Sequence, residues 1–377
     1  MLHSTLEPVF QLRENGYWLL LIYMLGCGLL VYMLPQKTML IDGRREQRWY
    51  LFNVLLLVTP YILWAGYRAP VGDTYAYSRS FMISPSSLSE LLRTLDPNGK
   101  DPGYNVLVTL IKMLGVRNSR TFLLLIAALQ ILCMSYTFRK YSPNFWISFF
   151  LFIASTDYIS WAFNGMRQFI AVCMIFAAFG LLVEKRYVWY ALVVFLASQI
   201  HGSALLMLPL AVVMEGKALN RKTVLLVIAT VLFMPFGSNF LPIMTELLAD
   251  TQYSTSMADD AWLRDDGTSM IRVLVYSVPA LIAILRYKYV RQSKNRVMNL
   301  CVNASIITMA LYLVSAVTSG VYMGRLPIYT TFQSYIALPW LIDQSFEKQS
   351  ATLIKFMLVV CYCAFFYYQM AIAWGIM

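Results

Sequence analysis

Residues 163–183 read FNGMRQFIAVCMIFAAFGLLV, and the run stays apolar until the charged triplet EKR at 184–186. About 20 apolar residues are enough for a helix to cross the hydrocarbon core of a bilayer. Similar runs recur along the chain, which is 59% hydrophobic and 13% charged, whereas soluble domains carry roughly 25% charged residues. The sequence therefore predicts an all-α, polytopic integral membrane protein with one transmembrane domain over 1–377. It excludes an ordinary soluble domain.

The apolar runs predict about ten full transmembrane helices with short broken or re-entrant helices among them. Residues 103–115 are too few to cross alone and are predicted to form a half-helix. Residues 187–214 are predicted to form a bent hairpin that returns to its starting side. The reason is that QIHGS at 199–203 interrupts the apolar run and basic loops flank both of its ends.

The charged loops predict the orientation of the bundle. The loops assigned to the cytoplasm hold 18 of the 30 Lys and Arg residues but only 6 of the 19 Asp and Glu residues, as the positive-inside rule requires. These loops are 35–48, 139–143, 184–186, 215–222, 286–297 and 343–355. The assignment places the N-terminus outside, together with the two longest polar loops, 67–102 and 237–270.

The remaining composition limits the classes of function. A net charge of +11 is explained by the basic cytoplasmic loops, so nucleic acid is not expected as a partner. The six cysteines all lie in apolar runs, which predicts neither a disulfide framework nor a metal site. No basic region precedes the first apolar run, so a cleavable signal peptide is not expected.

Arg167 stands near the start of the apolar run 163–183. An arginine at the bilayer centre costs about 2.5–3.5 kcal/mol, although one near a helix end can extend to the interface. Asn164 lies three residues earlier and is predicted to cap the helix. The first amides would then point outward beside a guanidinium, as in an anion site. Two interpretations stay open, an anion-binding residue or an arginine that only reaches the membrane surface.

His201 lies at the tip of the predicted hairpin, with Gln199 and Ser203 beside it. Polar residues at breaks in membrane helices often mark binding sites. A histidine that only stabilises the bend through hydrogen bonds would give the same pattern, so both interpretations are kept.

Two further arginines, Arg68 and Arg325, come from distant parts of the chain and fall on the predicted outer side with Arg167. Clustered arginines suit a phosphate group, which they bind by paired hydrogen bonds. The outer loop 237–270 carries Asp-Asp pairs at 259–260 and 265–266. These pairs lack metal-ligand spacing, so the loop is predicted to be a solvated acidic segment that could cover the site.

Four motifs occur in a fixed order and are separated by apolar segments: YRAPVGDTYAY at 67–77, DPGYNVLVTLI at 101–111, FNGMRQFIAV at 163–172 and SQIHGSALLMLP at 198–209. Together they resemble the EpsG-type family of bacterial exopolysaccharide polymerases, which is related to the Wzy O-antigen polymerases. The similarity is good over about 65–215 and looser in the C-terminal third, where Arg325 and Tyr329 carry it. The family usually has Glu-Pro-Gly-Tyr where this chain has Asp101-Pro-Gly-Tyr104.

The resemblance implies a membrane glycosyltransferase of the C type at the outer face of the bacterial inner membrane. It would transfer a growing undecaprenyl-diphosphate-linked glycan onto the next lipid-linked repeat unit. A chain-length regulator and a flippase would be nearby partners, and no cofactor or metal would be needed if arginines neutralise the diphosphate.

The resemblance also implies roles for particular residues. The diphosphate would be bound by Arg68, Arg167 and Arg325. The general base would be His201, Asp73 or Asp101, with His201 or Asp73 favoured. The sugar or the acceptor would be bound by Tyr77, Tyr104, Gln168, Asn164 and Tyr329.

Other functions are compatible with an outer cationic site. A flippase for the same lipid-linked oligosaccharide would need an internal repeat and a polar path through the membrane, yet the inner halves of most segments are apolar. A membrane O-acyltransferase with His201 as base would need a donor from the cytoplasm. A glycan ligase shares nearly all of the polymerase chemistry, and only the family resemblance separates the two.

Overall fold

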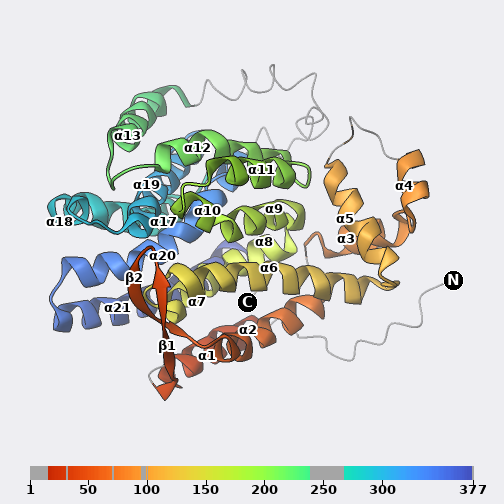
Figure 1. Cartoon of the computed structure of the whole chain (residues 1–377), viewed down its shortest axis with the longest axis horizontal. Helices are drawn as coiled ribbons and strands as arrows, with labels where there is room; N and C mark the ends of the chain where they lie inside the picture. The colour runs from red at the N-terminus through yellow and green to blue at the C-terminus, as the bar shows by residue number, and fades with distance from the viewer. Residues whose placement is uncertain are drawn as a thin grey trace.

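The computed structural model describes residues 16–30, 33–69, 72–94, 99, 101–237 and 267–375. These residues form a mostly helical bundle with one small sheet (Figure 1). The first half of the chain contains α1 (Gly16–Leu30), β1 (Gln36–Ile41), β2 (Arg44–Trp49), α2 (Leu51–Gly66), α3 (Thr74–Ile83), α4 (Leu88–Thr94), α5 (Pro102–Met113), α6 (Ser119–Tyr141), α7 (Phe145–Ala154), α8 (Asp157–Phe163), α9 (Met166–Ala177) and α10 (Phe179–Val183). The second half contains α11 (Tyr187–Ser198), η2 (Gly202–Leu206), α12 (Met207–Met214), α13 (Arg221–Phe233), η3 (Met234–Phe236), α17 (Met270–Leu285), α18 (Tyr287–Arg291), α19 (Arg296–Ala316), η4 (Met323–Arg325), α20 (Ile328–Ser345), α21 (Lys348–Tyr367) and η5 (Tyr368–Ala373).

Four helices among the described residues are long and apolar enough to cross a membrane: α6, α9 with α10, α19, and α21 with η5. A fifth span results if α7 and α8, which are bent by 62° at a short break, are taken together. The chain is thus a multi-pass helical membrane protein with four to five candidate spans. Other apolar helices are shorter, and α2 and α17 have 16 residues each. The predicted total of about ten spans stays a prediction.

The half-helix predicted over 103–115 corresponds to α5, which has 12 residues. At 1.5 Å per residue α5 is about 18 Å long, well short of the ~30 Å hydrocarbon core. Gly115 follows its end with φ +90°, a conformation that stops a helix and suits glycine. The half-helix is therefore confirmed in length.

The segment 35–48 is not the simple loop that the all-α prediction implied. β1 and β2 pair antiparallel, with Ile41 opposite Arg44. The two residues between the strands, Asp42 and Gly43, have φ of +48° and +74°, the positive values that a tight hairpin turn requires. The Asp-Gly pair was the available sequence signal for this hairpin.

The basic segments gather at one end of the bundle, the left end in Figure 1. Arg139 Nε donates to the Trp49 carbonyl (2.8 Å), and Arg286 Nη2 donates to the Ser345 carbonyl (2.6 Å). The helices α3, α4 and α5 lie at the opposite end. The loops assigned together by charge thus lie together in space, while the assignment of their end to the cytoplasm stays a prediction.

The bent hairpin predicted over 187–214 is present as α11, η2 and α12. Arg296 connects its two ends, because Arg296 forms two 2.7 Å hydrogen bonds with Glu215 and one of 3.4 Å with the Tyr187 hydroxyl. Both ends therefore meet at the basic end of the bundle, as predicted.

The ion pair between Glu215 and Arg296 predicts an acid-sensitive contribution to stability. Partial burial acts to raise the pKa of the Glu215 carboxyl, but the hydrogen bonds and the charge of Arg296 outweigh it and the pKa falls below its ordinary value. A carboxyl with a lowered pKa stabilises the fold above its unfolded pKa and loses that contribution as the pH falls. Because the pair is partly exposed, we expect Glu215→Gln to cost about 0.5–1 kcal/mol at pH 7. Thermal unfolding in detergent should show this difference at pH 7 and its disappearance toward pH 3; an equal difference at both pH values would contradict it.

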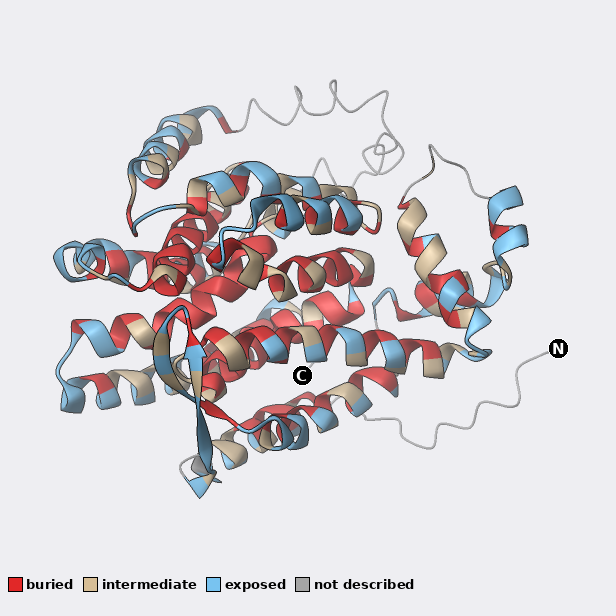
Figure 2. Cartoon of the chain, viewed as in Figure 1, coloured by how far each residue is buried: buried red, intermediate tan, exposed pale blue. Residues whose placement is uncertain are grey.

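The core extends through the bundle (Figure 2), and within it α20 packs against both α7 and α19. Nine of the ten residues of α7 are buried, as expected for a helix that is apolar on all sides. Phe152 contacts the rings of Phe169 and Phe332, with centroids 6.1 and 5.5 Å away. Through these ring contacts, the first turns of α9 and α20 both pack against α7.

Candidate functional site

The DPGY motif and the start of α9 are joined by an ion pair. Asp101 Oδ2 lies 2.8 Å from Arg167 Nη1, and the Asp101 side chain is only 4% exposed. The Arg167 side chain is 31% exposed, and its guanidinium carbon lies 5.6 Å from the centre of the Tyr104 ring. Arg167 is therefore neutralised from one side, held over an aromatic ring and still open to solvent.

The turn at Asp101 is bound to the tip of the hairpin. The Gly103 amide donates to the Gln199 carbonyl (2.8 Å). A Cβ added at Gly103 would lie 2.6 Å from the Gln199 Cβ, so only glycine allows this approach. The DPGY motif thus needs its glycine to bring Asp101 close to the segment that carries His201.

Asp73 binds the segment that precedes Arg167. Its Oδ2 accepts from the Gly165 amide (3.3 Å), and its own amide donates to Asn164 Oδ1 (3.1 Å). The predicted N-cap role of Asn164 is therefore wrong, because its side chain is bound to Asp73 and Gly165 precedes α9 with φ +88°. Only glycine adopts this value at low cost.

Arg68 is largely enclosed. Its Nε donates to Thr74 Oγ1 and its Nη1 to the Ala65 carbonyl, both at 2.9 Å, and the guanidinium lies 4.6 Å from the centre of the Phe163 ring. Burial lowers the pKa of Arg68 to about 10, so the side chain remains protonated at neutral pH. Its buried Nη2 has no hydrogen-bond partner among the described residues. Two of its donor atoms, Nε and Nη1, therefore hold the local fold.

His201 belongs to a chain of polar contacts that connects the hairpin to α9 and α20. Its Nδ1 lies 2.8 Å from Ser203 Oγ, which lies 2.9 Å from the Tyr329 hydroxyl. Gln168 Nε2 donates to Ser203 Oγ (3.4 Å) and to the Arg325 carbonyl (3.2 Å). The imidazole is thus oriented through its Nδ1 side.

The structure therefore brings all four motifs together at the end opposite the basic loops. Tyr77 is buried, with its ring 6.3 Å from that of Tyr104. Arg325 is exposed and is linked to the site through its carbonyl rather than its guanidinium. The Tyr104 hydroxyl and Gln168 Oε1 are buried and lack hydrogen-bond partners within the described residues, which suits groups that bind a polar ligand.

Sequence reasoning missed a buried acid next to this cluster. Asp157 is 1% exposed. Its Oδ1 accepts from the Tyr276 hydroxyl (2.6 Å) and its Oδ2 from the Tyr335 hydroxyl (2.5 Å). The available signal was a carboxylate inside the apolar run 144–161, because acids inside membrane segments are rare and usually have a function.

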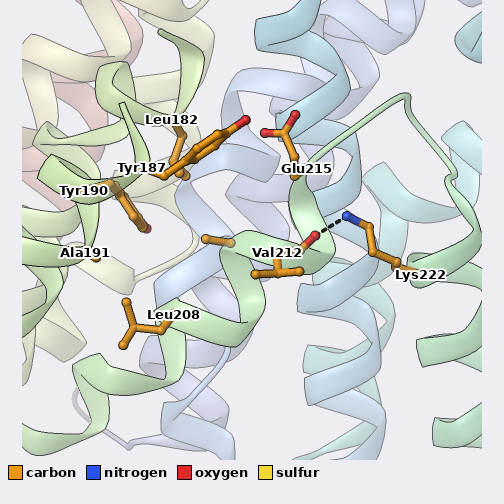
Figure 3. Close-up of a pocket in the computed structure, with 9 residues that line it drawn as sticks. Leu182, Tyr187, Tyr190, Ala191, Leu208, Val212, Glu215 and Lys222 are labelled. Atoms are coloured by element: carbon orange, nitrogen blue, oxygen red, sulfur yellow. Dashed lines mark hydrogen bonds between the residues drawn. The ribbon is translucent and has the colours of Figure 1, made fainter. Parts of the chain in front are cut away.

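Two pockets among the described residues lie at the basic end, away from these contacts. The larger, of about 430 Å³, opens between α11 and α12 and is mostly apolar, with Leu208 and Val212 among its lining residues (Figure 3). The smaller, of about 320 Å³, includes Arg44, Arg48 and Asp343. Neither of these two pockets is lined by a residue of the polar cluster, and the cluster is therefore described by its contacts.

No group of three or more His, Cys, Asp or Glu side chains lies close enough to hold a metal ion within the part of the chain that the structure describes. All six acidic residues of loop 237–270 lie outside that part, so a solvated acidic loop over the site stays a prediction.

A model described as the EpsG family matches residues 50–373. No curated protein and no solved structure matches the chain. The family match covers the four motifs and extends beyond them through the C-terminal third.

Proposed function

This chain belongs to the EpsG family, a family that indicates a membrane protein of polysaccharide biosynthesis, and on that premise we propose that it is a polysaccharide polymerase. It transfers a growing glycan from one undecaprenyl diphosphate onto the next lipid-linked repeat unit at the outer face of the inner membrane. The observation that carries this proposal is the meeting of Arg167, Asp101, Asp73 and His201, which come from four separate motifs, at one end of the bundle.

The proposed step is a displacement at the anomeric carbon of the growing chain. The acceptor hydroxyl forms the new C–O bond, the bond to the lipid diphosphate breaks, and the acceptor proton passes to a general base. The charge that develops on the leaving diphosphate is stabilised by Arg167, by the remaining N–H of Arg68 and by Arg325.

The contacts of the three candidate bases support His201. Asp101 is occupied by Arg167, and Asp73 accepts from the Gly165 amide, whereas the histidine is oriented through Nδ1 by Ser203. Tyr77, Tyr104, Gln168, Asn164 and Tyr329 are proposed to bind the sugar or the acceptor. No divalent metal is needed in this scheme, because arginines neutralise the leaving group.

Purified protein in nanodiscs, incubated with lipid-linked repeat units, tests the proposal. Chain growth is expected, with diphosphate-linked lipid released at each addition and with rates unchanged by a chelator. Translocation of the lipid in sealed vesicles without chain growth would instead support a flippase, and chain growth abolished by the chelator would refute the metal-independent mechanism.

The contact between Ser203 and His201 predicts an effect of Ser203 on the rate of chain growth. Ser203→Ala removes the hydroxyl that orients Nδ1 and should lower the rate of chain growth about 10-fold, as expected when a catalytic base loses its orienting group. Tyr329→Phe removes the hydroxyl that contacts Ser203 and, since Tyr329 is also proposed to bind the sugar or the acceptor, should weaken substrate binding as well. Single-turnover assays measure both, and full activity of Ser203→Ala would argue against His201 as the base.

A further inference from the structure

Asp157 joins three helices at one buried point. It begins α8, and its carboxylate accepts hydrogen bonds from Tyr276 of α17 and Tyr335 of α20. Trp161 Nε1 adds a third donor at 3.3 Å. Three donors satisfy most of the acceptor capacity of one carboxylate. Asp157 therefore connects these helices, and its buried carboxylate is well supplied with hydrogen bonds.

The backbone beside Asp157 is under strain that these contacts can offset. Thr156 has φ +69° and ψ +3°, and a left-handed conformation costs roughly 1–2 kcal/mol for a residue with a Cβ. This residue lies at the break where α7 and α8 turn by 62°. The bend therefore depends on interactions elsewhere, and the nearest strong ones are those of Asp157.

The helices α8 and α20, which Asp157 connects, both carry or adjoin residues of the candidate site. α8 has seven residues and ends at Phe163, which packs against Arg68 and is followed by the segment bound to Asp73 and by Arg167. α20 carries Tyr335 and, six residues earlier, Tyr329, which contacts Ser203. A change in the angle of α8 would move Arg167 relative to the residues that orient His201.

We propose that Asp157 is a positioning residue, which fixes the angle of α8 against α17 and α20 and thereby sets Arg167 and His201 at their working separation. Asp157 does not contact the substrate. The expected effect of Asp157 on the rate of chain growth rests on the proposed polymerase function. Its expected effect on the position of α8 does not.

The test compares Asp157→Asn and Tyr335→Phe with Thr308→Val in the full-length protein in nanodiscs. Thr308 is the matched control, since its buried hydroxyl lies 2.8 Å from Thr330 Oγ1 and so also bonds to α20, but without contacting α8. Hydrogen exchange of the amides at 164–168 reports the local structure, and steady-state kinetics with lipid-linked repeat units reports kcat and KM for folded protein.

We expect exchange at 164–168 to be at least 10-fold faster in Asp157→Asn than in the unsubstituted protein. Because a misplacement of about 1 Å can cost roughly 100-fold in rate, kcat should fall about 10- to 100-fold with KM nearly unchanged. Thr308→Val should change neither quantity. The inference is overturned if exchange at 164–168 is unchanged in Asp157→Asn, or if Thr308→Val raises it equally. Faster exchange in a protein that shows no chain growth even when unsubstituted would refute the proposed function and leave the positioning role supported.

Discussion

Arg167→Ala should lower the rate of chain growth by roughly 10²–10³, the usual cost of removing one group that stabilises transition-state charge. Single repeat units on the carrier lipid should accumulate in cells. The reason is that the Arg167 side chain is partly exposed and is also held in place by Asp101 and by the Tyr104 ring. Chain length on gels and the rate of release of the lipid diphosphate measure the effect.

The same substitution removes the guanidinium that faces the buried Asp101 carboxylate, which should destabilise the fold by about 3 kcal/mol. A double variant, Arg167→Ala with Asp101→Asn, removes that buried charge and should recover most of the stability but none of the activity. Arg167→Lys should retain part of the activity, because an ammonium keeps the charge and loses the paired geometry. Recovery of chain growth in the double variant would show that Arg167 acts only through the fold.

His201→Ala should lower the rate by roughly 10²–10⁴, the range for removal of a general base. Its folding should change little, since the imidazole is only half-buried and hydrogen bonds to Ser203 at the surface of the bundle. Binding of the lipid-linked substrate should persist, so the loss should appear in kcat.

Asp73→Asn is the control that separates the two favoured bases. An asparagine has the same shape and can still accept from the Gly165 amide, so the local structure should be kept. We expect the rate of chain growth to fall much less in Asp73→Asn than in His201→Ala. The opposite order, with near-normal activity in His201→Ala, would transfer the role of base to Asp73.

Hydropathy and motif order predicted the membrane character and the family of the chain, because both depend on properties that a sequence carries locally. The membrane character follows from runs of apolar residues, and the family follows from four short motifs in order. The bent hairpin was also predictable, since its interrupting polar residues and its basic flanks are adjacent in sequence.

The pairings inside the site were not predictable, because they depend on residues far apart in the chain. Asn164 has the right chemistry for a helix cap, but Asp73, 91 residues earlier, binds its side chain instead. Asp101 was considered as a base, and its burial against Arg167 comes from packing that no local pattern records. The partners of Asp157 could not be predicted, because Tyr276 and Tyr335 lie more than 100 residues away in the chain.

The hairpin of α11 and α12 starts and ends on the same side, so it contributes an even number of passes. Every helix after residue 214 would therefore have the same orientation across the membrane, whether or not the hairpin had yet entered the bilayer. A chain leaving the translocon can therefore fix the orientation of α19 and α20 independently and dock the hairpin afterwards. The histidine at its tip would then join a polar cluster whose other members, on α9 and α20, are already in place.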